Sequence, residues 1–292
     1  MTLCDRLHEV SCGSLGQRWL RYGTAVADDM DRLWLDSMPT AYDRWLVPSV
    51  FRPFAVDLAR RAGRLRPHRI LELAAGTGVL TRELTRAMPE VEVTATDLNI
   101  AMVDFGSARV AASWQQANAM SLPFIDGWFD LVVCQFGVMF FPDKPAAFAE
   151  TRRVLAPGGR FLFNTRDMLK THGFQQALVA SLQNVFPEDP PTFIVTTPHG
   201  YADVAIVAAD LTAGGLEQIS SQSVTLHGRA KSAADIAEGY CTGTPLRMEI
   251  ETRAELEATT AAIKHQMTAQ LGPGVVTAAM TAHVFESRRP TN

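Results

Sequence analysis

The feature that most constrains this chain is a short apolar segment that leads into a glycine-containing turn and then a helix. Residues 69–74 form the apolar run, Gly76 and Gly78 follow, and residues 79–88 space their apolar side chains as a helix does. Glycine lets the backbone turn sharply and lets a ligand approach closely. Because amides at the start of a helix point at the ligand, this turn predicts a binding site for a polar or anionic group.

Strand-like and helix-like segments alternate along the rest of the first half. The run 129–136 is continuously apolar, as expected of a central parallel strand that is covered on both faces. Alternation with short turns favours the α/β class, here a Rossmann-like doubly wound sheet that is mostly parallel. Further strands are predicted at 91–96, 112–116 and 160–164, and further helices at 51–63, 100–110 and 144–155.

The pattern changes after residue 165. The last two predicted strands are far apart in sequence, whereas a hairpin loop usually has two to five residues. We therefore predict an antiparallel last strand and a helical lid insert at 231–272, within one domain at 38–292 that follows a helical N-terminal extension at 1–37. The segments behind this prediction are strands at 217–226 and 275–285 and helices at 174–185, 201–213, 233–240 and 251–270.

The glycine turn alone leaves several nucleotide-binding classes open. A nicotinamide-binding turn needs a third glycine or alanine, where Thr81 stands, and a phosphate-binding P-loop needs a Lys-Ser/Thr pair that is missing. Asp97 follows about 20 residues later at the end of the second strand, where a carboxylate accepts hydrogen bonds from ribose hydroxyls. The alternatives are a plain tight turn at Gly76 and a helix N-cap at Asp97.

Three more segments complete a recognisable set. Asn118-Ala119-Met120-Ser121-Leu122-Pro123-Phe124 follows the third strand, an apolar run forms the fourth, and Pro157-Gly158-Gly159 precedes the fifth. In this order and spacing the set resembles the class I S-adenosylmethionine-dependent methyltransferases, in particular the branch similar to the ubiquinone/menaquinone C-methyltransferases. The resemblance covers residues 40–165 closely and the remainder loosely. It implies S-adenosyl-L-methionine as the cofactor and an enzyme of class EC 2.1.1.-.

The resemblance also implies roles for individual residues. The loop from Glu72 to Gly78 would wrap the methionine part of the cofactor, Asp97 would hold the ribose, and the backbone carbonyl of Gln135 would meet the ammonium. Asn118 would accept a hydrogen bond from the adenine amino group, where the family usually has Asp. The implied cofactor-binding residues are Tyr42, Glu72, Ala74, Gly76, Gly78, Asp97, Leu98, Met102, Asn118, Ala119, Met120 and Gln135.

Two of these positions carry a further condition. Ala74 stands where the family more often has glycine, which is tolerable if the ligand approaches closest at Gly76. Tyr42 lies in a segment that resembles the one with which relatives close over the cofactor; alternatively, it anchors the N-terminal helix to the core.

Methyl transfer from a sulfonium is an in-line displacement, so positioning contributes most and a catalytic side chain is optional. A neutral hydroxyl acceptor would still need a base. His199 is the preferred candidate base because His199-Gly200-Tyr201 opens a predicted helix facing the pocket. The other candidates beyond the fifth strand are the bases His172 and His227 and the donors Tyr201 and Tyr240, whereas His68 and His283 are predicted to be structural.

Charge and composition exclude several classes of partner. The net charge of −4 and the short basic pairs speak against nucleic acid, and no apolar stretch reaches membrane-spanning length. The four cysteines lack CxxC spacing and no zinc motif appears, so we predict a cytoplasmic protein without disulfides or a metal. Neither composition nor pattern assigns an oligomeric state.

The segment after the fourth strand indicates the kind of acceptor. It lacks the Asn/Asp-Pro-Pro-aromatic tetrad of amino-methylating DNA enzymes and instead offers Phe136, Val138, Met139, Phe140 and Phe141. We therefore predict in-line methyl transfer to a small, hydrophobic metabolite. The main alternative is a family member that keeps the cofactor but catalyses a non-methylating, pericyclase-like reaction or acts as a scaffold; a nicotinamide oxidoreductase is a weaker one.

Overall fold

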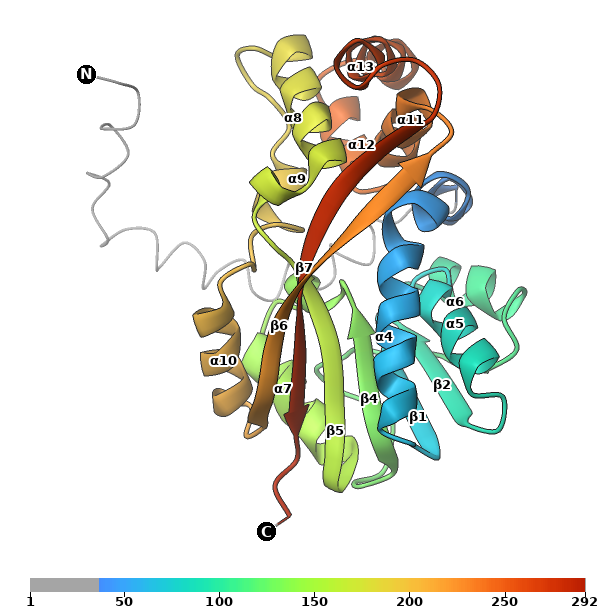
Figure 1. Cartoon of the computed structure of the whole chain (residues 1–292), viewed down its shortest axis with the longest axis vertical. Coiled ribbons are helices and arrows are strands. Elements are labelled where there is room, and N and C mark those ends of the chain that lie inside the picture. The colour runs from blue at the N-terminus through green and yellow to red at the C-terminus, as the bar shows by residue number, and fades with distance from the viewer. Residues whose placement is uncertain (1–36, 292) are drawn as a thin grey trace, which may run out of the picture.

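The computed structural model describes residues 37–291 and places a seven-stranded sheet below a helical cap (Figure 1). The strand order is β3-β2-β1-β4-β5-β7-β6. Strand β7 is antiparallel to both of its neighbours and the other pairs are parallel. The predicted fold class is thus confirmed. The strands are β1 Arg69–Leu73, β2 Glu92–Asp97, β3 Ser113–Gln116, β4 Phe129–Gln135, β5 Leu155–Arg166, β6 Glu217–Ala230 and β7 Val276–Arg288.

Helices cover both faces of the sheet. Helices α4, α5 and α6 lie on one face and α7 and α10 on the other (Figure 1). Strand β4 is apolar from Leu131 to Cys134 because its middle is enclosed from both sides, with Val132 and Val133 fully buried. The helices are α4 Arg52–Arg64, α5 Val79–Ala87, α6 Ile100–Ser107, α7 Lys144–Val154 and α10 Val204–Ala213, with short turns η3 Val138–Phe140 and η4 Leu169–Thr171.

The chain enters the sheet through a longer helical segment than predicted. The expected helix at 51–63 is preceded by α3, Met38–Ala41, and by a π-helical stretch η2, Tyr42–Phe51. Pro48 lies inside η2 and has no N–H to donate, so a regular α-helical ladder cannot continue there. The predicted extension at 1–37 lies outside the described residues except for its last residue.

The cap is broader than the predicted insert at 231–272. That insert folds as α11 Ala233–Gly243, α12 Leu246–Glu251 and α13 Leu256–Leu271. Helices α8, Gly173–Val185, and α9, Phe193–Thr196, come from before β6 and pack against it, as does η2. The cap has its own buried interior, to which Ile236, Cys241, Leu246, Ile250, Ile263 and Met267 contribute. It is therefore a second packed layer and not a single flap.

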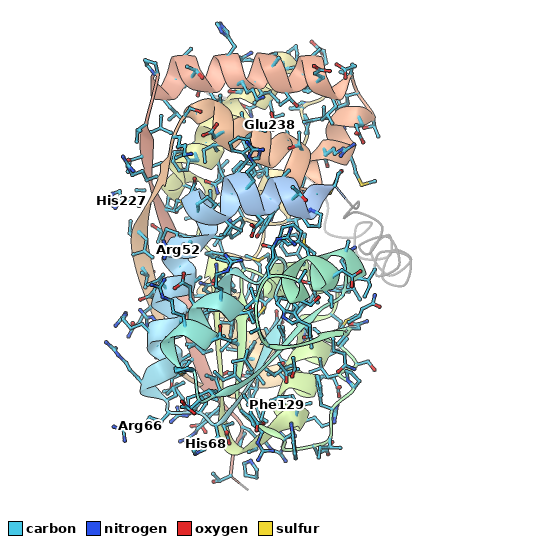
Figure 2. The ribbon with its side chains drawn as sticks, turned by 90° about the vertical axis from the view of Figure 1, so that its right-hand side faces the viewer. Arg52, Arg66, His68, Phe129, His227 and Glu238 are labelled. Atoms are coloured by element: carbon cyan, nitrogen blue, oxygen red, sulfur yellow. The ribbon has the colours of Figure 1, made fainter. Side chains whose placement is uncertain are left out.

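A two-stranded ribbon joins the cap to the sheet. Strands β6 and β7 stay paired well beyond the sheet, up to Ala230 opposite Val276. Figure 2 shows Glu238 in the cap, Phe129 at the opposite end of the molecule and His227 on the ribbon between them. The predicted strand at 217–226 was too short because the last four residues of β6, on the ribbon, are mostly small or polar and give a weak strand signal. The predicted strand at 275–285 stopped before the polar residues 286–288, which pair with β5 in the sheet. No helix among residues 37–291 is long and apolar enough to cross a membrane.

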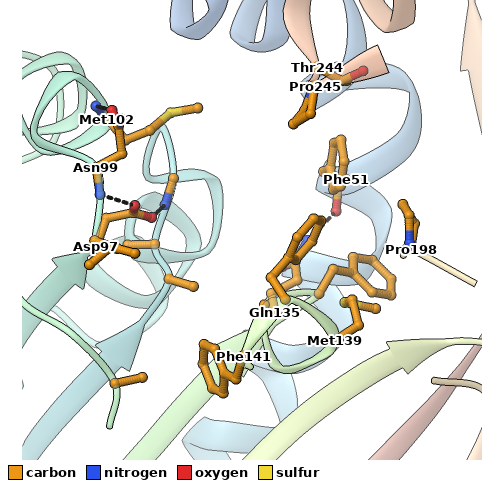
Figure 3. Close-up of a pocket in the computed structure, with 18 of the residues that line it drawn as sticks. Phe51, Asp97, Asn99, Met102, Gln135, Met139, Phe141, Pro198, Thr244 and Pro245 are labelled. Atoms are coloured by element: carbon orange, nitrogen blue, oxygen red, sulfur yellow. Dashed lines mark hydrogen bonds between the residues drawn. The ribbon is translucent and has the colours of Figure 1, made fainter. Parts of the chain in front are cut away.

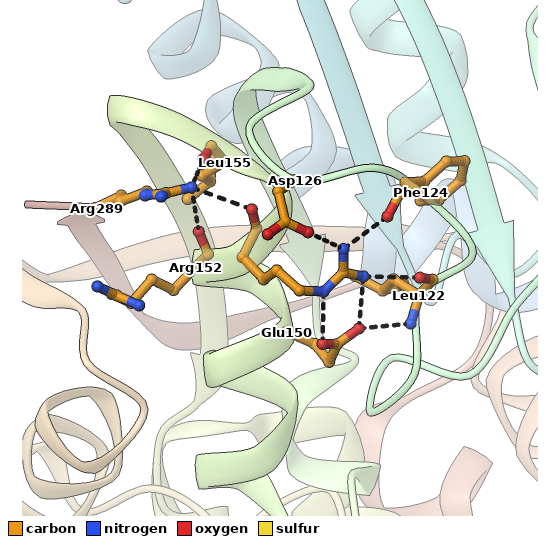
Figure 4. A network of polar contacts seen from close by, with 8 residues as sticks. Leu122, Phe124, Asp126, Glu150, Arg152, Leu155 and Arg289 are labelled. Carbon is orange, nitrogen blue, oxygen red and sulfur yellow. Dashed lines mark hydrogen bonds and ion pairs between the residues drawn. The ribbon is translucent and has the colours of Figure 1, made fainter.

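One polar network fixes the loop between β3 and β4 (Figure 4). The Arg153 guanidinium on α7 donates to both carboxylate oxygens of Glu150, to Asp126, and to the carbonyl oxygens of Leu122 and Phe124, at 2.7–2.8 Å. The Glu150 carboxylate also accepts from the Leu122 N–H at 2.8 Å. This loop therefore has a defined position although it contains almost no regular structure.

Candidate functional site

A deep cleft lies between the carboxyl ends of the parallel strands and the cap (Figure 3). One wall is polar and carries Asp97, Asn99 and Met102. The facing wall is mainly apolar, with Phe51 and Met139 among its residues, and Thr244 and Pro245 of the cap close the cleft from above. The carboxyl edge of an open α/β sheet is where such folds bind ligands.

The cleft collects the implied cofactor-binding residues and the preferred base, except that Gly78 does not line it. The others do: Tyr42, Glu72, Ala74, Gly76, Asp97, Leu98, Met102, Asn118, Ala119, Met120, Gln135 and His199.

The two glycines of the turn have different tasks. Gly76 has a φ of +55°, and a Cβ added there would meet nothing within 4 Å, so its backbone is bare toward the cleft. Gly78 has a φ of +83° and begins α5, but a Cβ there would approach Trp114 Cη2 to 2.9 Å. Gly78 is thus needed for packing on the side away from the cleft. Ala74 also has a positive φ, +51°, which explains why glycine would suit that position.

Asp97 holds two loops together at the end of β2. Its carboxylate accepts from the Gly76 N–H at 2.8 Å and from the Asn99 N–H at 2.9 Å, as Figure 3 shows. The N-cap of α6 is Asn99, whose side chain accepts from the Met102 N–H at 3.2 Å. Asp97 therefore fixes the glycine turn and is not the helix cap that was the alternative reading.

Glu72 is a buried acid at the base of the same turn. Its carboxyl is 1% exposed and accepts from the Thr81 hydroxyl at 2.7 Å. Burial raises the pKa of Glu72 to about 8. Thr81, which occupies the third glycine position of a nicotinamide-binding turn, is thus the hydrogen-bond partner of this acid.

The loop after β3 supplies the far end of the polar wall. The Asn118 side-chain oxygen accepts from the Met120 N–H at 2.9 Å and keeps one lone pair for a second bond. Ala119 and Met120 line the cleft beside it. The network around Arg153 holds the remainder of this loop.

The end of β4 begins the apolar wall. The Gln135 side chain donates to the Phe51 carbonyl at 3.0 Å, which ties β4 to the entry helix. Phe136 has a φ of +51°, and its N–H donates to the side chain of buried Asn164 at 2.9 Å. This sharp turn directs the following apolar residues, including Met139 and Phe140, into the cleft.

His199 lies under the cap with one ring nitrogen engaged. Its Nδ1 is 2.7 Å from the Asp167 carbonyl oxygen, so Nδ1 carries the proton and Nε2 is left as an acceptor. Nε2 is buried and has no hydrogen-bond partner among residues 37–291. Burial, together with the charge of Arg166, lowers the pKa of His199 to about 4, so the ring is neutral at pH 7.

Of the other candidate bases and donors, only Tyr240 lines the cleft. The Tyr240 hydroxyl lies in the cleft and is bonded to Gln175. Tyr201 lies outside it and donates to Asp210 at 2.6 Å, since α10 begins only at Val204. Three histidines also lie outside the cleft: His172 is buried beside His199, His227 is exposed on β6, and His283 bonds to Ser223 and Asp167.

Several lining residues were not selected from sequence: Phe51, Asn99, Arg166, Gln175, Phe193, Thr244 and Pro245. Arg166 carried a readable signal, because it ends an apolar strand in the same way as Asp97. The predicted strand stopped at residue 164, which hid that signal. The cap residues gave no such signal, since their place depends on how distant helices pack.

Comparison with known proteins agrees with this architecture. Residues 70–159 match the family model of a methyltransferase domain. The ubiquinone/menaquinone biosynthesis C-methyltransferase UbiE of Dinoroseobacter shibae is 28% identical over 216 residues, which span 68% of this chain and 78% of that protein. UbiE of Methylobacterium nodulans is 41% identical over 115 residues, which span 37% of this chain and 46% of that protein. The chain thus matches about half the length of several of these relatives.

Solved structures share the fold at low sequence identity. The phosphoethanolamine N-methyltransferase 2 of Haemonchus contortus, in complex with S-adenosyl-L-methionine, is 15% identical with a TM-score of 0.56, covering 91% of this chain and 60% of that one. The YcgJ protein from Bacillus subtilis is 19% identical with a TM-score of 0.52, covering 82% of this chain and all of that one. The matched residues show that this chain contains a methyltransferase domain, and the chain as a whole is similar to the UbiE C-methyltransferases of the class I S-adenosylmethionine-dependent methyltransferases.

Proposed function

We propose that this enzyme methylates a small, hydrophobic acceptor held between the apolar wall and the cap. The observation that carries this proposal is the pairing, in one cleft, of the bare Gly76–Asp97 turn with the apolar wall. We call the first part the cofactor half (residues 72, 74–76, 97–99, 102 and 118–120). The acceptor half comprises residues 136–137 and 139–141 together with Arg166, Gln175, Phe193, His199, Tyr240 and Thr244, whereas Val138 is buried behind it.

The cofactor half fits S-adenosylmethionine. The backbone at Gly76 is open toward the cleft, and Asp97 lines the cleft at the end of β2, where a carboxylate would meet the ribose hydroxyls. Leu98 and Met102 would flank the adenine, and Asn118 would accept from its amino group. Tyr42, whose ring packs on Phe51 at 4.7 Å, would close over the methionine end.

The chain's own residues supply positioning and a dry environment. When bound, the cofactor supplies an electrophilic methyl group on a positively charged sulfur. The aromatic wall excludes water, and a fixed acceptor in line with the methyl group lowers the barrier by about 7–11 kcal/mol in favourable cases. His199 Nε2 would accept the proton of an acceptor hydroxyl, because Nδ1–H is committed to the Asp167 carbonyl.

The names of the matched relatives suggest which acceptors to test first. Because several are ubiquinone/menaquinone biosynthesis C-methyltransferases, quinols with an unsubstituted ring carbon lead the panel. The purified chain is incubated with methyl-labelled S-adenosylmethionine and each acceptor, and product and S-adenosylhomocysteine are measured by mass spectrometry. We expect the methylated product to carry the label. We also expect product and S-adenosylhomocysteine to form in equal amounts. A transformed acceptor without label would instead support the non-methylating alternative.

A further inference from the structure

Arg166 is a buried cation in the acceptor half of the cleft. It is the last residue of β5, is 4% exposed and lines the cleft. Its guanidinium lies over two aromatic rings, 4.6 Å from the centroid of Phe136 and 5.2 Å from that of Phe51. These contacts hold the side chain but do not neutralise its charge.

No carboxylate among residues 37–291 pairs with this guanidinium. Its Nη1 is buried without a hydrogen-bond partner, and none of its nitrogens forms an ion pair within that part of the chain. Arg153 shows the contrast, since its guanidinium donates five hydrogen bonds, two of them to Glu150 and one to Asp126. A buried, unpaired charge is costly, so the cleft lacks an anion that a ligand would supply.

The position of Arg166 in the sheet favours the acceptor as the source of that anion. From β2, which carries Asp97, the strands run β1, β4 and β5. At about 4.8 Å per strand, Arg166 starts roughly 14 Å from Asp97 and roughly 10 Å from the glycine turn after β1. The charge of Arg166 acts on the His199 ring and the Tyr240 hydroxyl, both in the acceptor half, and also on the Tyr42 hydroxyl. Gln175 bonds to that Tyr240 hydroxyl.

The groups beside Arg166 define the ligand more closely. His199 Nε2 is an unpaired acceptor, and Gln175 Oε1 is a second buried acceptor without a partner among residues 37–291. A guanidinium next to neutral acceptors suits a group that combines an anionic oxygen with a neighbouring hydroxyl.

We infer that Arg166 binds an anionic oxygen, a carboxylate or phenolate, on the methyl acceptor of this enzyme. This inference rests on the proposed function for the identity of the cleft. The carboxylate of the cofactor offers the same chemistry, an anionic oxygen. The experiment must therefore distinguish an anionic group on the acceptor from the carboxylate of the cofactor.

The test uses matched pairs of aromatic probes on the full chain saturated with S-adenosylhomocysteine. Salicylate is compared with salicylamide, and naphthoate with naphthamide, by calorimetry. We expect each carboxylate to bind at least about tenfold more tightly than its amide in the wild type. Arg166→Met should reduce that ratio to about two or less, while Arg229→Gln, a change at an exposed arginine on β6, should leave it intact.

The other possible results of this experiment contradict either the inference or the proposed function. Equal binding of acid and amide in the wild type, or an unchanged ratio in Arg166→Met, would overturn the inference. A tenfold loss of S-adenosylhomocysteine affinity in Arg166→Met with the ratio preserved assigns Arg166 to the cofactor carboxylate instead. Failure of the wild type to bind S-adenosylhomocysteine would refute the proposed function separately.

A second measurement needs no ligand. Because Arg166→Met removes an unpaired buried charge, we expect the unliganded variant to melt a few degrees higher than the wild type. Arg166→Lys, which keeps the charge but not the planar fork, should show no such gain and should keep part of the preference for carboxylates. A lower melting temperature for Arg166→Met would show that the arginine is a structural residue.

Discussion

The two halves of the cleft differ in how their polar groups are satisfied. In the cofactor half, Asp97 and Asn118 accept backbone N–H groups from neighbouring loops, so their orientation is fixed before any ligand arrives. In the acceptor half, Arg166 Nη1, Gln175 Oε1 and His199 Nε2 are buried without hydrogen-bond partners in the described part of the chain. The first half is therefore preorganised by the backbone, whereas the second is completed only by its ligand.

The largest effect on the contrast between the two halves is expected from adding a side chain at Gly76, in the glycine turn of the cofactor half. Gly76→Val would place a side chain at a φ of +55° directly in the space for the methionine part, so we expect S-adenosylhomocysteine affinity to fall by about a thousandfold or more. Calorimetry measures the loss, with circular dichroism as the check on folding.

Gly272→Val is the matched control. Gly272 also has a positive φ, +89°, and an open Cβ position, but it lies between α13 and β7, away from the cleft. It should lose similar stability and bind S-adenosylhomocysteine normally. Equal loss of affinity in both variants would mean that backbone strain alone explains the effect.

The cofactor half should lose stability at alkaline pH. The Glu72 pKa is raised from 4.5 to about 8 in the folded protein, so the folded state holds a proton that the unfolded state releases. The contribution of Glu72 to the free energy of unfolding is then fully present below pH 4.5. It falls by about 3–4 kcal/mol as the pH rises to 8 in the unliganded protein. Glu72→Gln should flatten that fall in urea unfolding at pH 5 to 9. An unchanged slope would mean that Glu72 ionises normally.

The core beside the acceptor half, where His172 packs against His199, should show the opposite dependence. Burial lowers the pKa of His172 from 6.5 to about 2, so the unfolded state binds a proton that the folded state does not bind. Its contribution is present above pH 6.5 and is lost as pH falls, by about 2 kcal/mol between pH 6.5 and 5. His172→Phe should retain more stability than the wild type over that interval in the same unfolding assay. Parallel curves for the two proteins would contradict the assignment.

The smallest expected effect sharpens the comparison within the cofactor half. Asp97→Ala should weaken S-adenosylhomocysteine binding by about tenfold and also lower stability, because the Gly76 and Asn99 N–H groups lose their acceptor. Asp130 is the control, since its carboxylate also accepts two backbone N–H groups, from His68 and Arg69, at the far end of β1. Asp130→Ala should lower stability but not affinity.

Sequence alone predicted which residues meet at the polar wall of the cleft because these parts are local. The glycine turn and Asp97 each follow directly from a strand, and parallel strands bring their carboxyl ends together. Part of the acceptor half was missed because Arg166, Gln175 and Thr244 come from β5, α8 and the cap. Their meeting depends on the packing of α11 against η2, where a Cβ on Gly243 would approach the Tyr42 nitrogen to 2.6 Å. Short-range patterns do not encode such contacts.

The β6–β7 ribbon has a consequence for how this enzyme can diverge. Ala230 and Val276 are paired, so the intervening segment leaves and re-enters the structure at adjacent positions. The entropy of closing a loop grows only slowly with its length, so this segment can lengthen, shorten or exchange helices at little cost. The core strands that carry Gly76 and Asp97 keep their register throughout such changes. The part of the acceptor half that this stretch carries, including Tyr240 and Thr244, can therefore be remodelled as one continuous stretch of the gene while the cofactor half is inherited intact.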